Sequence, residues 1–284
     1  MNIDISTVSP VLHNGGRAIV LGPLEGTEFM RVAVTGSAGR MGSAVCEAVV
    51  ADQELDLVAA IDPSAKGQKD ITGSVGVVAS IEELDSTDID VLVDFTKASA
   101  ARANIEWCAE NGVHAVVGTS GLTETDISLY RKRFTSSNCL VAPNFAIGAV
   151  LLMRFAEMAA PFFPTAEIIE LHHDQKIDAP SGTAMETLKR MAEASGDWGP
   201  DPTEHENLPG ARGAVGKDGI TVHSVRLRGL VAHQEVLLGA DGETLTLRHD
   251  SLDRSSFMGG ITLACRVIEE HPGVTVGLDT FLGV

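Results

Sequence analysis

The sequence is short of cysteine, of positive charge and of long apolar runs, and each shortage excludes a class of protein. Its four cysteines lie far apart, so they form neither a CxxC motif nor a Cys/His metal cluster. We expect buried, reduced thiols in a cytoplasmic protein. The formal net charge of -18 disfavours a nucleic-acid partner, because phosphates are neutralised by clustered Lys and Arg. Apolar runs such as 146–153 are far too short to span a bilayer, so we expect no membrane partner.

The first 29 residues differ from the rest of the chain. They lack a basic stretch followed by a continuous apolar stretch, which disfavours a secretory signal. A strand-like run begins directly at Met30. We therefore interpret residues 1–29 as an N-terminal extension and expect it to be poorly ordered.

The chain between residues 30 and 147 alternates apolar strands with helices. The predicted strands are 31–35, 57–61, 91–95, 114–117 and 139–141. Strands that are apolar along their whole length are typical of a parallel sheet covered on both faces. The pattern predicts an α/β fold, with a Rossmann-type doubly wound parallel sheet as a dinucleotide-binding domain.

The pattern changes after residue 148 to that of a second, α+β domain over 148–253. We expect helices at 149–160 and 183–194, a strand at 166–172, a long loop at 197–219, and strands at 220–228, 233–239 and 243–250. The close spacing of the last three strands suggests an antiparallel meander. Residues 254–284, with a helix near 257–270 and a strand at 274–277, are expected to return to the first domain.

A glycine-rich turn follows the first strand and opens the first helix. Gly36, Gly39 and Gly42 have GxxGxxG spacing, which lets the backbone approach a pyrophosphate at the helix N-terminus. A tight turn alone explains such glycines about as often as a cofactor does. Asp62, which closes the second strand 20 residues after Gly42, stands where an adenosine ribose is held. Together the two features predict a dinucleotide site.

The residues around Asp62 favour NADH, with NADPH tolerated. A carboxylate at this place disfavours a 2′-phosphate, and Pro63 supplies no cation beside it. Arg40 remains available to a phosphate or the ribose. Three further turns, 94–96, 118–120 and 142–145, follow predicted strands, so they lie at the carboxyl edge that lines a cofactor crevice. As bare sequence they are weak signals, because turns are usually rich in such residues.

The densest group of reactive side chains lies in residues 170–184. His172 and His173 can each exchange a proton near neutral pH, but neighbours at a strand end point to opposite faces, which favours different jobs. Lys176 can pair with a carboxylate or donate a proton. The turn Ser181-Gly182-Thr183 opens a helix and can hold a second carboxylate. One histidine alone would more often be an ordinary solvated side chain, but the whole group is hard to explain that way. Adjacent histidines seldom share one zinc ion, so we expect no metal.

These segments resemble one enzyme family. The stretches 32–42 and 170–184, together with 118–120, 142–145 and 249–257, are similar to 4-hydroxy-tetrahydrodipicolinate reductases (dihydrodipicolinate reductases), especially actinobacterial ones. The resemblance covers essentially residues 30–284, and its HHxxKxDAPSGT string is highly specific. It implies hydride transfer from NAD(P)H to a cyclic dicarboxylate in lysine and diaminopimelate synthesis, and a homotetramer formed through the second domain.

The resemblance also implies residue roles. His172 is the expected proton donor and acceptor, and Lys176 a proton donor that also contacts the substrate. His173 and the turn Ser181, Gly182 and Thr183 are expected to bind the substrate. The expected cofactor contacts are Gly36, Ser37, Ala38, Gly39, Arg40, Met41, Asp62, Phe95, Thr96, Gly118, Thr119, Ser120, Ala142, Pro143, Asn144 and Phe145. Of these, Phe95 and Thr96 are expected from their place in the turn 94–96 at the carboxyl edge of the sheet.

Other functions remain open from the residues alone. An aspartate or homoserine dehydrogenase would need its own catalytic pattern, which the sequence does not display. A dinucleotide sensor without activity would lack a titratable cluster opposite the cofactor, whereas this chain has one. Family members that favour NADPH tend to carry an arginine directly after the acidic residue, and Pro63 stands there instead.

Overall fold

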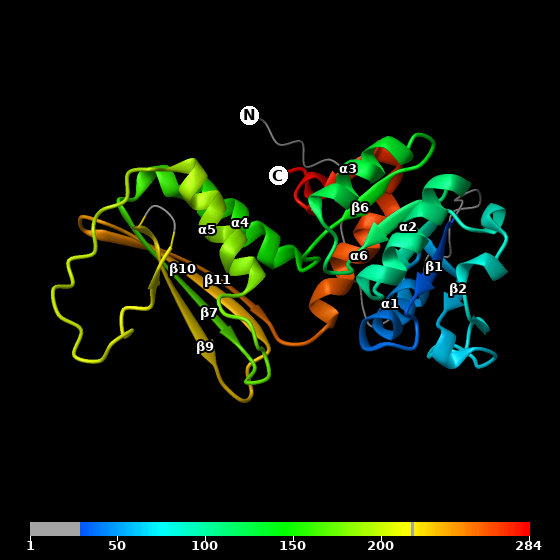
Figure 1. Cartoon of the computed structure of the whole chain (residues 1–284), viewed down its shortest axis with the longest axis horizontal. Coiled ribbons are helices and arrows are strands. Elements are labelled where there is room, and N and C mark those ends of the chain that lie inside the picture. The colour runs from blue at the N-terminus through cyan, green and yellow to red at the C-terminus, as the bar shows by residue number, and fades with distance from the viewer. Residues whose placement is uncertain (1–28, 217–218) are drawn as a thin grey trace, which may run out of the picture.

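The protein has two lobes, each built on its own β-sheet (Figure 1). The structure is a computed structural model that describes residues 29–216 and 219–284. Residues 1–28 of the predicted extension lie outside the described residues. No helix in the described ranges is both long enough and apolar enough to cross a bilayer.

The first lobe contains a seven-stranded sheet in which every pairing is parallel. The strand order is β12-β6-β5-β4-β1-β2-β3. The strands are β1 (Met30–Thr35), β2 (Leu55–Ile61), β3 (Val77–Val78), β4 (Val91–Asp94), β5 (His114–Val117), β6 (Cys139–Val141) and β12 (Val274–Val276). The order reverses at β1, which creates the crevice where such sheets bind ligands. The predicted Rossmann-type sheet is confirmed, and β12, near the end of the chain, pairs with β6 at its edge.

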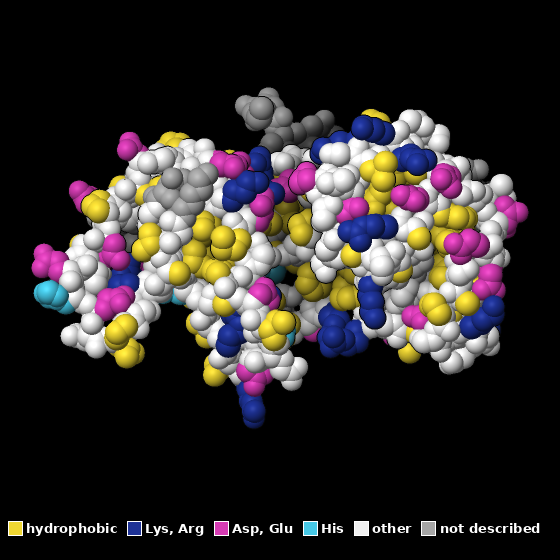
Figure 2. Space-filling view, viewed as in Figure 1, with side chains coloured by type: hydrophobic (Ala, Val, Ile, Leu, Met, Phe, Trp, Pro, Cys, Tyr) yellow, Lys and Arg dark blue, Asp and Glu magenta, His cyan; other side chains and the backbone are white. Residues whose placement is uncertain are grey.

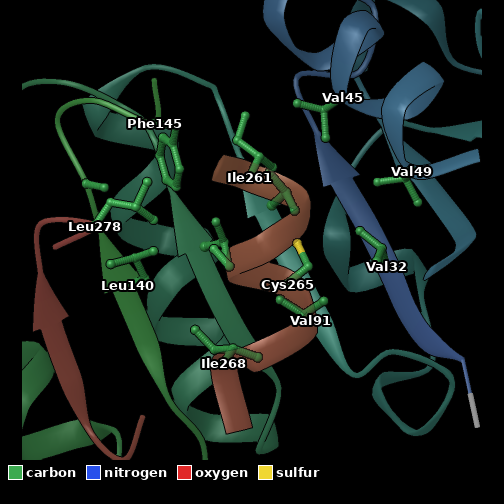
Figure 3. Close-up of a cluster of buried hydrophobic side chains, with 14 of the residues drawn as sticks. Val32, Val45, Val49, Val91, Leu140, Phe145, Ile261, Cys265, Ile268 and Leu278 are labelled. Atoms are coloured by element: carbon green, nitrogen blue, oxygen red, sulfur yellow. The ribbon is translucent and has the colours of Figure 1, made fainter. Parts of the chain in front are cut away.

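Helices cover both faces of this sheet. The helices are α1 (Arg40–Ala51), α2 (Ala98–Asn111), α3 (Glu124–Arg133) and α6 (Ser255–Val267). Alternate side chains of β1 enter different cores, Val32 and Val34 on the face of α1 and α6, and Ala33 on the face of α2 and α3. Figure 3 shows α6 lying along the sheet, with Ile261, Cys265 and Ile268 buried against it. The last segment of the chain is therefore part of the first core.

The second lobe has a five-stranded mixed sheet with two helices on one face. It contains α4 (Ile147–Ala159), α5 (Gly182–Ala194), β7 (Thr165–His172), β8 (Ala214–Val215), β9 (Thr221–Arg226), β10 (Ala232–Ala240) and β11 (Glu243–Ser251). Short 3₁₀ helices complete the described structure at Pro63–Ala65, Ile81–Glu83, Ser86–Asp88, Ala160–Phe162, Ile268–Glu270 and Thr280–Leu282. Ile168, Leu188 and Met191 pack in the core between the sheet and these helices.

The prediction that the last three strands of this lobe form an antiparallel meander is wrong for the first of them, β9. The strand order is β11-β10-β7-β9-β8, so β7 separates β9 from β10, and β9 runs parallel to β7. Only β10 and β11 form the expected antiparallel hairpin. This arrangement places Arg226, at the end of β9, directly beside His172, at the end of β7.

Candidate active site

The glycine-rich turn leaves the start of α1 open to a ligand. Gly36 has a positive φ of 72°, and Gly39 caps α1 without any side chain. A Cβ on Gly42 would lie 2.1 Å from the carbonyl oxygen of Gly36, so only glycine allows this close approach. The hydroxyl of Ser37 is buried without a hydrogen-bond partner among the described residues. The cradle therefore fits a phosphate group at the helix N-terminus.

Asp62 closes β2 next to this turn. It accepts hydrogen bonds from the Ser64 amide (2.9 Å), the Ser64 hydroxyl (2.6 Å) and the Ala38 amide (3.2 Å). Desolvation alone would raise the pKa of Asp62, but these hydrogen bonds outweigh it and lower the pKa below its ordinary value. Asp62 is thus an anion that also fixes the glycine-rich turn.

A cavity of about 760 Å³ opens between these elements at the carboxyl edge of the sheet. Of the predicted cofactor contacts, its lining includes Gly36, Gly39, Asp62, Phe95 and Thr96. Lys97, just before α2, and Asn104, in the middle of α2, are among the further polar lining residues that were not singled out from the sequence. Its size suits a drug-sized or nucleotide-sized ligand.

Asp94 organises the floor of this cleft. The side chain is fully buried at the end of β4 and accepts hydrogen bonds from Thr35 (2.8 Å), Asn104 (2.7 Å), Thr119 (2.6 Å) and the Thr96 amide (3.0 Å). One carboxylate thereby joins the ends of β1, β4 and β5 to helix α2. In the sequence, Asp94 stands out only as the start of a turn.

Some of the remaining predicted cofactor residues are buried in the core, and others are exposed outside the cavity. Ala142 and Phe145 are buried in the core, where Phe145 lies beside Phe95 with ring centroids 5.9 Å apart. A Cβ on Gly118 would meet the Phe95 ring at 2.1 Å, so this glycine makes room for the ring. Ala38, Arg40, Ser120 and Pro143 are exposed and Met41 is half-buried, but none of them lines the 760 Å³ cavity.

A second, smaller cavity of about 40 Å³ lies where the two lobes meet. Figure 2 shows a hollow between the lobes, with hydrophobic side chains along its walls. The lining of the small cavity includes the predicted residues Asn144, His172, Ser181 and Thr183. The Asn144 amide donates to the Thr183 hydroxyl at 3.3 Å, so a loop of the first lobe touches the first turn of α5. The structure therefore brings part of the cofactor edge and part of the 170–184 motif together.

The same cavity contains residues from distant strands that sequence analysis did not assign to the site. Gln234 and His233 come from β10, and His249 comes from β11. The Gln234 amide nitrogen donates to Thr187 at 2.7 Å, while its buried carbonyl oxygen has no partner among the described residues. Gly148 permits this arrangement, because a Cβ there would lie 2.5 Å from the His249 ring. No local signal placed these strands beside His172.

His172 belongs to a hydrogen-bonded group centred on Glu170. Nδ1 of His172 lies 2.6 Å from Oε2 of Glu170, whose side chain is completely buried. The same carboxylate accepts two bonds from Arg226, at 2.8 and 2.9 Å, and one from the Ser181 amide at 3.2 Å. Strand periodicity would have suggested the pair, because residues two apart on a strand share a face.

Burial and charge shift the pKa values of this group. Desolvation would raise the pKa of Glu170, but hydrogen bonds from Arg226, Ser224 and His172 outweigh it and lower the pKa. Desolvation lowers the pKa of His172, and the Glu170 carboxylate only partly opposes it. The free protein therefore holds a carboxylate next to a neutral imidazole at neutral pH.

Of the remaining predicted substrate residues, Ser181 lines the small cavity, whereas His173, Lys176 and Gly182 do not. His173 is exposed, and its Nδ1 accepts the Gln175 amide at 3.2 Å, so the two histidines do face different surroundings as predicted. Lys176 binds both carboxylate oxygens of Asp178 at 2.8 Å. Ser181 caps α5 by accepting the Ala184 amide at 3.2 Å, and Gly182 is exposed. Among the described residues, no group of three or more His, Cys, Asp or Glu is placed to hold a metal.

Comparison with known proteins identifies the family. Residues 30–145 match dihydrodipicolinate reductase, N-terminus, and residues 148–282 match dihydrodipicolinate reductase, C-terminus. The 4-hydroxy-tetrahydrodipicolinate reductase of Cutibacterium acnes is 47% identical over 263 residues, covering 90% of this chain and 100% of that protein. The enzyme of Nocardia farcinica is 50% identical, covering 89% and 98%.

Solved structures agree with this assignment. The dipicolinate-bound dihydrodipicolinate reductase from Paenisporosarcina sp. TG-14 is 40% identical, with a TM-score of 0.78, and the match covers 89% of this chain and 99% of that chain. A myo-inositol dehydrogenase from Corynebacterium glutamicum is only 16% identical, with a TM-score of 0.56, which is a likeness of fold alone. The chain belongs to the dihydrodipicolinate reductase family.

Proposed function

We propose that this protein reduces 4-hydroxy-tetrahydrodipicolinate to tetrahydrodipicolinate with NAD(P)H, on the diaminopimelate route to lysine. The observation that carries the proposal is the cavity between the lobes, where His172 and Thr183 meet Asn144 from the dinucleotide lobe. An acid/base and an anion-holding turn thus lie beside the carboxyl edge of a Rossmann-type sheet. Relatives 47–50% identical to the chain bear this enzyme name.

The first lobe is proposed to bind the dinucleotide, which supplies a hydride when bound. The open N-terminus of α1 holds the pyrophosphate, and Asp62 holds the adenosine ribose. Phe95, Thr96 and the turns at 118–120 and 142–145 complete the site. NADH is favoured because the Asp62 carboxylate repels a 2′-phosphate, with Arg40 and Lys97 available to phosphates elsewhere.

Loss of water, made of the 4-hydroxyl and a proton from the neighbouring carbon, gives an unsaturated ring that can accept a hydride. His172 is proposed to return a proton to that neighbouring carbon after hydride transfer. Its Nδ1 faces Glu170, which leaves Nε2 for the substrate or a bridging water. A bound dianionic substrate favours the protonated imidazole electrostatically. His172 thus changes from neutral in the free protein to a proton donor when the site is filled.

The carboxylates of the substrate are proposed to be held by cations and by the start of α5. Thr183 and Gly182 offer backbone N–H groups at a helix N-terminus, where the dipole favours an anion. Lys176 must leave Asp178, and His173 must turn from its exposed position, to reach the same ligand. Binding therefore requires the 173–181 segment to rearrange and the lobes to close.

We also propose the domain division that goes with this closure. Residues 30–147 form the dinucleotide domain, 148–253 the substrate and oligomerisation domain, and 254–284 the return, with hinges near 146–148 and 251–255. The working form is proposed to be a cytoplasmic homotetramer joined through the second sheet. Burial raises the pKa of Cys265 to about 12, which suits a thiol that stays reduced.

Turnover tests the proposal directly. Purified protein should oxidise NADH when the cyclic substrate is generated by the enzyme that precedes it, and should be inactive with aspartate or homoserine. His172→Ala should lower kcat roughly 10²–10⁴-fold, and Lys176→Ala should mainly raise KM. His205→Ala and Lys189→Ala are matched controls, because both residues are exposed and lie outside both cavities. NADH binding without turnover would indicate a sensor, and unchanged rates in both site variants would contradict the assigned roles.

A further inference from the structure

We propose that Glu170 is the positioning residue for His172, and that Arg226 is its counter-cation, so that the two together set when His172 carries a proton. The inference rests on the proposed function, in which His172 donates the proton. It adds two residues that lie 56 positions apart in the chain and that were given no role from the sequence.

The geometry of the group carries the inference. Glu170 and His172 share one face of β7, and β9 lies parallel to β7 with Arg226 opposite His172 and Ser224 opposite Glu170. The Glu170 side chain has 0% exposure, yet both of its oxygens are used, Oε2 by His172 and Arg226, and Oε1 by Arg226 and Ser181. A carboxylate buried this completely is stable only as part of such a network.

The bond to Glu170 fixes which nitrogen of His172 carries hydrogen. A carboxylate accepts, so Nδ1 of His172 must donate, and Nε2 is then the nitrogen that exchanges a proton with the substrate. The ring is held against rotation at the same time. Loss of the carboxylate would leave both ring orientations and both tautomers open.

The charges around His172 oppose one another. Glu170 raises the pKa of His172, whereas Lys176 and Arg226 lower it, after the larger lowering by burial. His233 and His249, from β10 and β11, line the same cavity, and Asp250 pairs with His233 at 2.7 Å. Because Glu170 and Arg226 act in opposite directions, removing each must move the titration of His172 in opposite directions.

The same pair also ties the proton donor to the anion-holding turn. The Ser181 amide donates to Glu170, and Arg226 donates to the carbonyl oxygen of Asp178 at 2.6 Å. The segment between His172 and Thr183 is therefore held at both ends by one ion pair. A substrate that binds to the turn and displaces it will therefore also displace Glu170 and Arg226, which position His172.

The experiment compares pH profiles with a direct titration of the imidazole. Activity requires protonated His172, so it falls as pH rises through the His172 pKa. Glu170→Gln should move this alkaline fall in kcat to lower pH, and Arg226→Gln should move it to higher pH. Arg226→Lys keeps a cation and should restore much of the wild-type profile. Imidazole NMR, assigned with His172→Gln, should show the same opposite shifts in the His172 resonance.

Glu167→Gln is the matched control. Glu167 also lies on β7 and also pairs with an arginine and a histidine, Arg212 and His223, but outside the cavity between the lobes. This variant should leave the alkaline limb and the His172 resonance where they are. A shift equal to that of Glu170→Gln would mean a general effect of lost charge and would overturn the inference.

The outcomes separate the two proposals. If the His172 resonance moves in opposite directions while the kcat profile does not follow, the pair controls His172 but His172 is not the proton donor. If neither variant moves the resonance, Glu170 and Arg226 are only structural and the inference is overturned. Should Glu170→Gln not fold, Glu170→Asp keeps the charge but withdraws it from Nδ1, and an unmoved resonance would again overturn it.

Discussion

Each lobe of the protein places one fully buried carboxylate beneath its part of the site, but the two carboxylates have different partners. Asp94, in the first lobe, is bound by neutral donors from Thr35, Thr96, Asn104 and Thr119. Glu170, in the second lobe, is bound by the cation Arg226 and by the titratable His172. The first carboxylate joins loops, and the second joins a charge to a titratable imidazole.

The difference matches what each lobe has to do. A dinucleotide is recognised mainly through backbone N–H groups and close approach, so its lobe needs fixed loops and glycines. Proton transfer needs a group whose protonation state is controlled by its neighbours. Neutral donors hold a loop without placing a charge beside a titratable group, whereas the ion pair of Glu170 and Arg226 places two opposite charges beside His172. Removing a carboxylate should therefore damage binding in one lobe and the pH dependence of turnover in the other.

The largest expected effect in the dinucleotide lobe comes from Gly42→Ala. The new Cβ would lie 2.1 Å from a backbone oxygen, and neither the turn nor the start of α1 can move without the other. We expect a loss of at least about 3 kcal/mol in the free energy of unfolding, and roughly ten-fold weaker NADH binding. Denaturant melts and NADH fluorescence titration measure the two effects. Gly76→Ala, where no atom lies within 4 Å, is the control. Equal tolerance of both variants would mean that the turn is not closely packed.

A smaller effect is expected from Asp94→Asn, which sharpens the comparison with Glu170→Gln. The NH₂ group of the new amide would face a donor, either the Thr119 hydroxyl or the Asn104 amide, that now donates to the carboxylate. Loss of that hydrogen bond should cost about 1–3 kcal/mol of stability. NADH binding should weaken with it, because three loop ends lose their common anchor. The pH profile of kcat should keep its shape. An alkaline limb displaced as in Glu170→Gln would show that the two carboxylates do not differ in the way proposed.

The sequence predicted where the strands and helices lie along the chain better than it predicted which of them are neighbours in space. Strands such as β5 and β6 were placed at their observed bounds because short, wholly apolar runs have few other uses. The pairing of β9 with β7 was missed, since nothing local says which strands meet. That error also hid Arg226, whose role depends entirely on this pairing.

The candidate site shows the same limit. His172, Ser181 and Thr183 were found because they lie close together in one unusual string of residues. Glu170 belongs to that string, but its position two residues before His172 on a strand was not used. Gln234 and His249 reach the cavity only because β10 pairs with β7, β11 pairs with β10, and both lie against α4, which requires the assembled sheet.

The smallest expected effect concerns cofactor choice and comes from Asp62→Asn. Loss of the anion removes a charged acceptor for the ribose and the repulsion of a 2′-phosphate, so NADH binding should weaken about five- to ten-fold, or about 1–1.4 kcal/mol. NADPH binding should stay the same or improve, because an amide does not repel phosphate. Titration of both cofactors measures the ratio, and Asp56→Asn, an exposed change of equal charge on β2, is the control. If binding of both cofactors weakens equally, Asp62 acts only by holding the Ala38 amide and the glycine turn, and the proposed basis for a preference for NADH is wrong.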